Sequence, residues 1–467
     1  MKDSFEKLIY LLNSNNNKYI KIAIYALRKF FVDKVKNNNL IDEKGNVNLN
    51  ENNFYLDDFI NLKIYEKLFE ILNQNKIDYI NCYEIFWILL DSSIFPSKIG
   101  DNLYDYYSIF LSKKNIDLYN YYITDIQTPK EIVLLLIKFI SNLCLFNEKI
   151  RLLLLKNNFI SNSFSKIKNL NENINYDVFA EFYHLFSIIA KNYNNFDLNS
   201  SKIFFHIFSS PLNIINNEEI EIYCLYGLEK LSKIKDENII QLFKESNIII
   251  NNYKTFLESP LNEQSISYLL KTLSNLLLNT DSINIKDFIQ KISILNIYLF
   301  LINPSIINLF NEKENIQSEI IIGLGNLCLI DSNYIINVIN NDNIYNFLLN
   351  ILNESSFKNK IYVLKTFYNL YKGDNIQYNQ DKIIFLLKKL SIMMKIEVNK
   401  KLIEEIIDLN FILISIVINN NESNIEGISI ILNNLGYEDI IQRKEIYESL
   451  NKEQYNILNS LIRINEN

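Results

Sequence analysis

One short phrase recurs along this chain: an Asn inside an apolar stretch, followed by Leu. Four copies are strong, and three weaker ones are centred on Asp91, Ser187 and Lys230. Successive copies are on average about 46 residues apart, within the range of roughly 40–47 residues that is typical of repeats built from two or three helices. Such repeats stack, and each buries its apolar face against the next one. The strong copies are Ser141-Asn142-Leu143, Ser274-Asn275-Leu276, Gly325-Asn326-Leu327 and Tyr368-Asn369-Leu370.

The composition predicts an all-α chain. Only 5 Pro and 8 Gly occur in 467 residues, too few for a β protein with many tight turns. Residues 131–140 are almost entirely apolar and continue without a breaker to about Phe146, so we expect a buried helix there. Thr128 and Pro129 mark its start, because a hydroxyl cap followed by Pro is a typical helix entry.

Several classes of function are disfavoured. A net charge of −7 argues against direct nucleic-acid binding. The four Cys are far apart and only two His occur, so the spacing typical of metal ligands is missing and we expect no bound metal. No cofactor-binding or catalytic motif is present, so we expect that the chain binds no cofactor and is not an enzyme. No signal-peptide pattern and no apolar run of 18 residues occur, which predicts no membrane segment and a cytoplasmic or nuclear location.

The domain organisation is predicted to be one solenoid over residues 1–467. Residues 34–55 are polar and are interpreted as an insertion. Residues 92–128 are rich in Tyr and are interpreted as a second insertion, which could add its own helix and serve packing rather than binding. Residues 425–467 are expected to form a C-terminal capping repeat.

In order along the chain, the repeats resemble those of importin alpha, the armadillo-repeat adaptor of nuclear import. Residues 23–31 (AIYALRKFF) resemble the family's opening segment, and residues 84–91 (EIFWILLD) resemble its first Trp-containing helix. Residues 315–369 are similar to its sixth and seventh repeats in order and spacing, and residues 436–442 (GYEDIIQ) to its closing segment. The resemblance implies a right-handed superhelical solenoid of about eight to ten armadillo-type repeats.

The resemblance also implies a peptide-binding groove lined by the third helix of each repeat. In this family a Trp forms slots for the stems of Lys or Arg, and an Asn one turn later holds the backbone of an extended peptide. The expected partner is a cargo protein with an extended, basic nuclear-localisation segment. The expected groove residues are Glu84, Trp87, Asp91, Asn142, Tyr183, Tyr226, Asn275, Asp281, Asn326 and Asn369.

The chain departs from the family at several positions. Lys138, Lys271 and Lys365 stand at Trp positions, and only the one at 271 is usual for the family, where Arg occurs. These Lys residues are either solvated or mark a groove that prefers acidic partners. The first repeat begins within about ten residues of Met1, without the basic segment that binds importin beta, so importin beta is a doubtful partner.

Two hypotheses for function remain open. The first is an importin-alpha-like adaptor for nuclear import, and the alternative is an armadillo-repeat interaction scaffold that no longer serves nuclear import. The individual residues also have structural interpretations. Trp87 could be a core aromatic residue, and the four repeated Asn residues could make structural hydrogen bonds, since Asn in the middle of an apolar helix needs a partner.

Overall fold

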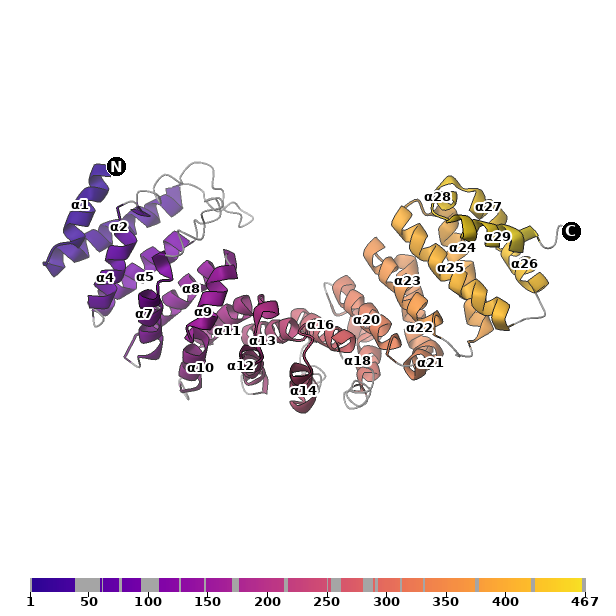
Figure 1. The fold of residues 1–467 in the computed structure, drawn as a ribbon, viewed down its shortest axis with the longest axis horizontal. Helices are drawn as coiled ribbons and strands as arrows, with labels where there is room; N and C mark the ends of the chain where they lie inside the picture. Colours follow the sequence, from indigo (N-terminus) through magenta and orange to yellow (C-terminus); the bar gives the residue numbers. More distant parts are fainter. Residues whose placement is uncertain are drawn as a thin grey trace. The chain divides into compact units, whose positions relative to one another are not determined.

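In the part of the chain that it describes, the computed structural model is built of helices (Figure 1). The chain divides into two compact units, residues 1–242 and 243–467, and each is described by itself. The structure describes residues 2–37, 59–60, 62–74, 78–93, 109–125, 127–146, 148–169, 176–213, 217–249, 251–252, 262–279, 289, 293–310, 313–330, 332–373, 378–420 and 425–463.

In the first unit, five helices form a row in which each packs on the next. They are α2 (Asn17–Asn37), α5 (Tyr79–Ser93), α8 (Lys130–Phe146), α11 (Tyr176–Ala190) and α13 (Glu218–Leu231). The helix predicted here is α8, which begins at Lys130, one residue after the predicted Pro129, and ends at the predicted Phe146. A second layer packs on this row and consists of α4 (Ile64–Gln74), α7 (Lys113–Thr124), α10 (Phe159–Asn169) and α12 (Leu198–Ser209). The other α-helices among the described residues here are α1 (Lys2–Leu12), α9 (Glu148–Lys156) and α14 (Glu237–Glu245), and α14 contains the division between the units.

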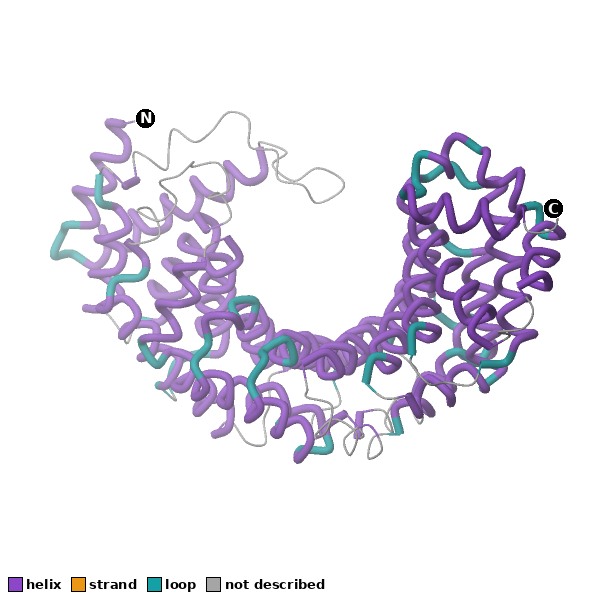
Figure 2. Tube along the Cα trace, turned by 45° about the vertical axis from the view of Figure 1, so that its right-hand side comes forward, coloured by secondary structure: helices purple, strands orange, loops and turns teal. Residues whose placement is uncertain are grey.

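The second unit repeats this plan. Its row consists of α16 (Glu263–Asn279), α20 (Lys313–Cys328), α23 (Phe357–Tyr371) and α25 (Lys400–Asn420). Its second layer contains α18 (Ile294–Leu301), α22 (Asp342–Glu354) and α24 (Gln380–Ile396), with the short helices α19 (Pro304–Ile307) and α21 (Ser332–Asn340) before α20 and α22. The tube in Figure 2 shows the helical layers within each unit. We call the row helices of each unit the third-helix row.

The C-terminal helices pack on the end of the second unit. They are α26 (Ile425–Asn434), α27 (Tyr437–Gln442), α28 (Lys444–Tyr447) and α29 (Lys452–Arg463). The first three contact α24 or α25, and α29 packs on α26 and α27. Arg443 donates hydrogen bonds to the carbonyl groups of Met394 and Glu397 at the end of α24. The guanidinium thereby satisfies carbonyls that a helix C-terminus leaves without an intrahelical partner.

The Tyr-rich stretch contributes to the core. Tyr119 and Tyr122 on α7 are fully buried, and their hydroxyl groups donate to the carbonyls of Phe110 at 2.7 Å and Leu72 at 3.0 Å. Because α7 packs on α8 and α10, it is a second-layer helix of the stack rather than an addition to it. Burial of Tyr is tolerated here because each hydroxyl group has a hydrogen-bond partner. Residues 94–108 of the proposed insertion, and residues 38–55 of the polar one, lie outside the described residues.

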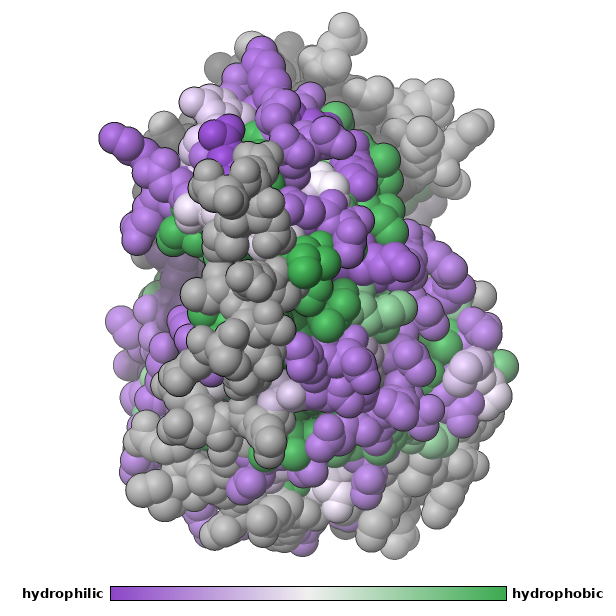
Figure 3. Space-filling view, turned by 90° about the vertical axis from the view of Figure 1, so that its right-hand side faces the viewer, coloured by the Kyte–Doolittle hydropathy of each residue, from purple (hydrophilic) through white to green (hydrophobic). Residues whose placement is uncertain are grey.

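The surface is mixed in character. On the face drawn in Figure 3, hydrophobic residues form small patches between hydrophilic ones. Among the described residues, no helix is both long enough and apolar enough to span a membrane.

Candidate functional site

The first candidate site joins two consecutive helices of the third-helix row. Glu84, Trp87 and Asp91 are spaced by three and four residues on α5, so they share one helix face. Arg28 on α2 reaches all three side chains. Its Cζ atom lies 4.5 Å from the centroid of the Trp87 ring, its Nε atom is 3.6 Å from Glu84 Oε2, and its Nη1 atom donates to Asp91 Oδ2. We call these four residues the Arg28 cluster.

The electrostatics of the Arg28 cluster are dominated by burial. Burial raises the pKa of Asp91 to about 6, although the guanidinium of Arg28 acts in the opposite direction. Two carboxylates and an aromatic face therefore surround one cation, which is the arrangement that recognises a guanidinium group. In this structure the chain's own arginine takes that position.

Asn142, Asn326 and Asn369 each connect two neighbouring row helices. Asn142 Nδ2 donates to Ser93 Oγ at 3.0 Å, Asn326 Nδ2 to the carbonyl of Ser274 at 3.3 Å, and Asn369 Nδ2 to the carbonyl of Gly325 at 3.3 Å. In each case the acceptor belongs to the preceding row helix, so one contact recurs in both units. All three amides are half-buried. Each contact uses one of the two N–H groups of the side-chain amide. The other N–H group and the carbonyl oxygen Oδ1 are left to bond a further partner.

Close packing supports the contact between α20 and α23. A Cβ atom at Gly325 would lie 2.9 Å from Thr366 Oγ1, so glycine permits the two helices to approach. Thr366 Oγ1 also donates to the carbonyl of Ile321 at 3.0 Å. Thr366 and Asn369 thus hold α23 on α20, and Asn359 adds two more side-chain hydrogen bonds, one from Ser318 and one to the carbonyl of Glu314.

Ion pairs join the same helices. The three Lys residues that stand at Trp positions each lie near a glutamate of the following row helix. The distances from Nζ to the carboxylate are 3.5 Å for Lys138–Glu181, 3.8 Å for Lys271–Glu319 and 3.3 Å for Lys365–Glu405. We call these the row ion pairs, and they largely neutralise the lysine charge at this surface.

A histidine adds to the first of these pairs. His184 Nδ1 lies 3.6 Å from Glu181, and its ring stacks on Tyr223 of α13 at 4.9 Å between centroids. Burial acts to raise the pKa of Glu181, but His184 and Lys138 outweigh it and hold that pKa below its usual range.

The other predicted groove residues have different surroundings. Tyr183 is 2% exposed and packs against Phe186, so it does not line an open surface here, because nearly the whole circumference of α11 is buried. Tyr226 is half-buried beneath Lys230, whose Nζ atom lies 4.6 Å from the ring centroid. Asn275 is half-buried on α16, and Asp281 lies outside the described residues.

Arg28 and the three glutamates of the row ion pairs are not predicted from the sequence. In the sequence, Arg28 stands out only as part of a resembling segment, and Glu181, Glu319 and Glu405 are not singled out. A signal for the glutamates exists, because each follows its lysine by about one repeat. Which residue lies opposite the lysine depends, however, on how far adjacent helices are offset, and connection lengths vary along the chain.

The described residues contain no group of three or more His, Cys, Asp or Glu side chains placed to hold a metal ion. All four Cys are buried, and burial raises the pKa of Cys82 to about 11. The predictions that the chain binds no cofactor and is not an enzyme stay predictions.

Comparisons with known proteins establish the fold. No protein-family model matches the chain, and no curated protein matches it. One similar solved structure has a TM-score of 0.61 and 11% sequence identity, and the match covers 98% of this chain and 85% of the other. That structure concerns a phosphorylation switch that controls the interaction between cadherin and beta-catenin. A designed armadillo repeat protein in complex with the peptide (KR)4 has a TM-score of 0.43 and 13% identity over 58% of this chain and 98% of its own. The predicted fold class is confirmed: the chain is an all-α solenoid of armadillo-type repeats.

Proposed function

We propose that this chain is an interaction scaffold that holds an extended peptide segment of a partner protein against its third-helix row. One observation carries this proposal: the half-buried amides of Asn326 and Asn369 lie on two successive row helices of the second unit, each bonded to the preceding helix, and Asn142 makes the equivalent contact in the first unit. The similar structure concerns an interaction between two proteins, cadherin and beta-catenin, and the role proposed here belongs to the same class.

The physical basis is the pairing of amide with amide. A peptide bond carries one donor and one acceptor, which match the remaining N–H group and the Oδ1 atom of each asparagine. Because each asparagine is already held by its neighbour, less side-chain entropy is lost when a peptide binds. Such contacts recognise the peptide backbone, so specificity would depend on the peptide side chains between the contacted positions.

The charges on the row bear on the kind of peptide. The row ion pairs neutralise Lys138, Lys271 and Lys365, so the surface is balanced rather than acidic. We therefore expect backbone hydrogen bonds to supply more of the affinity than cationic side chains do.

The test is a selection of random displayed peptides on the full chain, followed by fluorescence-anisotropy titration of the selected peptides. The double variant Asn326→Ala/Asn369→Ala is expected to weaken them about tenfold or more, because two hydrogen bonds are lost. Asn337→Ala, an exposed asparagine on α21, is the matched control and should leave affinity unchanged. Selected peptides that all bind the double variant as tightly as the wild type would refute the proposal.

A second candidate is the adaptor for nuclear import, which binds basic segments and moves between cytoplasm and nucleus. It is supported by the Arg28 cluster, in which Trp87, Glu84 and Asp91 bind a guanidinium. A partner's arginine would have to displace Arg28 from that position.

Anisotropy with a bipartite basic nuclear-localisation peptide separates the two candidates. The adaptor predicts micromolar or tighter binding that weakens with added salt and in Trp87→Ala/Asp91→Ala, because the contacts are charge-assisted. The scaffold predicts no binding of this peptide even at low salt, and binding of selected uncharged peptides.

A further inference from the structure

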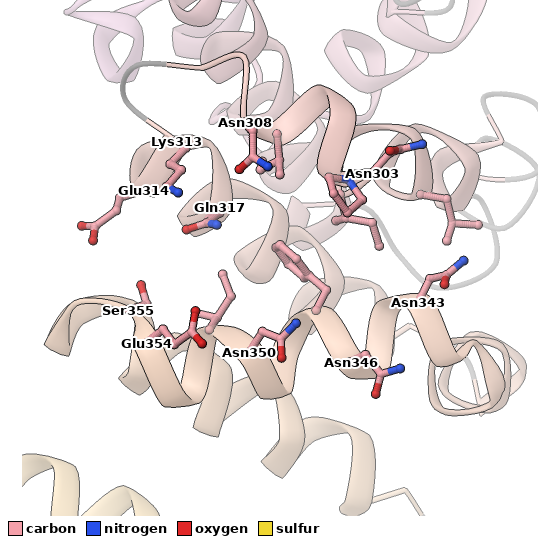
Figure 4. Close-up of a pocket in the computed structure, with 16 residues that line it drawn as sticks. Asn303, Asn308, Lys313, Glu314, Gln317, Asn343, Asn346, Asn350, Glu354 and Ser355 are labelled. Atoms are coloured by element: carbon pink, nitrogen blue, oxygen red, sulfur yellow. The ribbon is translucent and has the colours of Figure 1, made fainter.

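A cleft of about 620 Å³ lies in the second unit, away from the asparagines of the third-helix row. One wall is formed by α18, α19 and the first turns of α20, and the facing wall is α22 (Figure 4). The lining contains none of the row asparagines and no residue of the row ion pairs, so the cleft is separate from the surface proposed above.

Amide side chains line both walls. In Figure 4 these amide side chains lie on both walls, some on the upper wall and others along α22. Among the described residues, Asn308, Gln317, Asn346 and Asn350 have no hydrogen-bond partner for their side-chain amides. The six amide residues are Asn303, Asn308 and Gln317, then Asn343, Asn346 and Asn350.

The floor between the walls is apolar. The buried Ile302, Ile307 and Ile351 line the cleft together with the half-buried Phe347. An apolar side chain of a ligand would contact Phe347 and remove further apolar surface from water.

One end of the cleft is charged. Glu314 on α20 and Glu354 on α22 lie at this end together with Lys313 (Figure 4). Two carboxylates against one ammonium group leave a net negative charge, which favours a cationic group on the ligand.

We propose that this cleft binds an extended peptide segment of a partner protein, with a Lys or Arg at the Glu314–Glu354 end and an apolar side chain over Phe347. The lining of α22 runs from Asn343 to Glu354, a rise of roughly 17 Å at 1.5 Å per residue. An extended chain covers that length in about five residues. Its peptide groups would pair with the amides of both walls.

A peptide fits these features better than an oligosaccharide does. Amides also bind sugar hydroxyl groups, but the apolar floor and the charged end correspond to an apolar and a cationic side chain on one segment. The proposal is independent of the one for the third-helix row, because the two sites share no residue.

The test uses random heptapeptides displayed on phage and selected on the full chain. Each selected peptide is synthesised with a fluorescent label and titrated against the wild type, Asn346→Ala/Asn350→Ala and Gln317→Ala, which change opposite walls. Exposed Asn→Ala changes in a helix favour helix formation, so these variants should fold, and thermal melting checks this. The controls are Asn337→Ala and the row variant Asn326→Ala/Asn369→Ala.

We expect a class of peptides carrying a basic and an apolar residue whose affinity falls about tenfold or more in Asn346→Ala/Asn350→Ala and severalfold in Gln317→Ala. These peptides should bind both controls within about twofold of the wild type. The proposal is overturned if no selected peptide loses affinity in both Asn346→Ala/Asn350→Ala and Gln317→Ala. It is also overturned if a panel of oligosaccharides shows that dependence while the peptides do not.

Discussion

The guanidinium of Arg28 lies 4.5 Å from the ring of Trp87, on the following helix of the row. The same guanidinium contacts Glu84 and Asp91, so the residues predicted to receive a partner's basic side chain receive one from the chain itself. Arg28 therefore contributes to the packing of α2 on α5, and any basic peptide at this position must compete with it.

Replacing Arg28 with Met should destabilise the first unit by about 2 kcal/mol, because Asp91 would lose the partner of its buried charge. Trp87 is the single Trp of the chain, so its fluorescence during urea unfolding reports this region. Lys29→Met, an exposed neighbour on α2, is the control. Equal urea midpoints for the two variants would show that the Arg28 contacts contribute little.

The stability of the first unit should depend on the ionisation of Asp91. Its pKa is about 6 in the folded chain against an ordinary value of 3.8, so the folded state keeps a proton that the unfolded state has lost. The stabilisation is complete below about pH 3.8 and is lost as pH rises through about 6. Between pH 4 and 7, wild type should thus lose about 2–3 kcal/mol relative to Asp91→Asn, which mimics the protonated acid.

The measurement is the unfolding free energy of both proteins, from Trp87 fluorescence at each pH. Arg28→Met should move the decline to higher pH, because Arg28 is the group that lowers this pKa. A difference between wild type and Asp91→Asn that stays constant from pH 4 to 7 would contradict the assignment.

The row ion pairs should each contribute modestly. Lys365 is 55% exposed, so its pair with Glu405 is screened by water and is worth about 0.5 kcal/mol. Lys365→Glu should therefore speed amide hydrogen exchange in α25, and Lys365→Glu/Glu405→Lys should restore it. Lys401→Glu, an exposed site on α25, is the control for the added charge. No recovery in the double variant would mean that the pair has no direct coupling.

Gly227 on α13 should tolerate no side chain. A Cβ atom there would lie 2.3–2.5 Å from three ring atoms of Phe208 on α12. Gly227→Ala is expected to cost about 1–3 kcal/mol through overpacking, measured by thermal unfolding. Adding Phe208→Leu should cost less in the Gly227→Ala variant than in the wild type, because the smaller side chain relieves the clash. If the losses of stability from Gly227→Ala and Phe208→Leu were additive, α12 would be free to move away from the new side chain.

The row helices could be predicted from sequence because the repeat phrase reports their packing. Asn142, Asn326 and Asn369 recur because each bonds the preceding row helix, and Leu143, Leu327 and Leu370 follow them because those positions are buried. Such a pattern can be recognised within a single sequence, because every repeat packs on its neighbour in the same way.

The pairing of particular side chains could not be predicted in the same way. Arg28 and Asp91 are 63 residues apart, and their contact depends on the rotation and offset of two helices. Tyr183 occupies the position expected to face a groove, yet it is buried, because α11 is enclosed on nearly all sides. Tertiary packing decides both outcomes.

The asparagines of the third-helix row are proposed to hold a peptide through its backbone. The most direct test of this proposal is to titrate a peptide selected on the row against the wild type and Asn326→Ala/Asn369→Ala, together with analogues N-methylated at single backbone positions. The account predicts that methylation at contacted positions weakens binding to the wild type about tenfold and hardly affects the double variant. N-methylated analogues that bind the wild type as tightly as the parent peptide would contradict the claim.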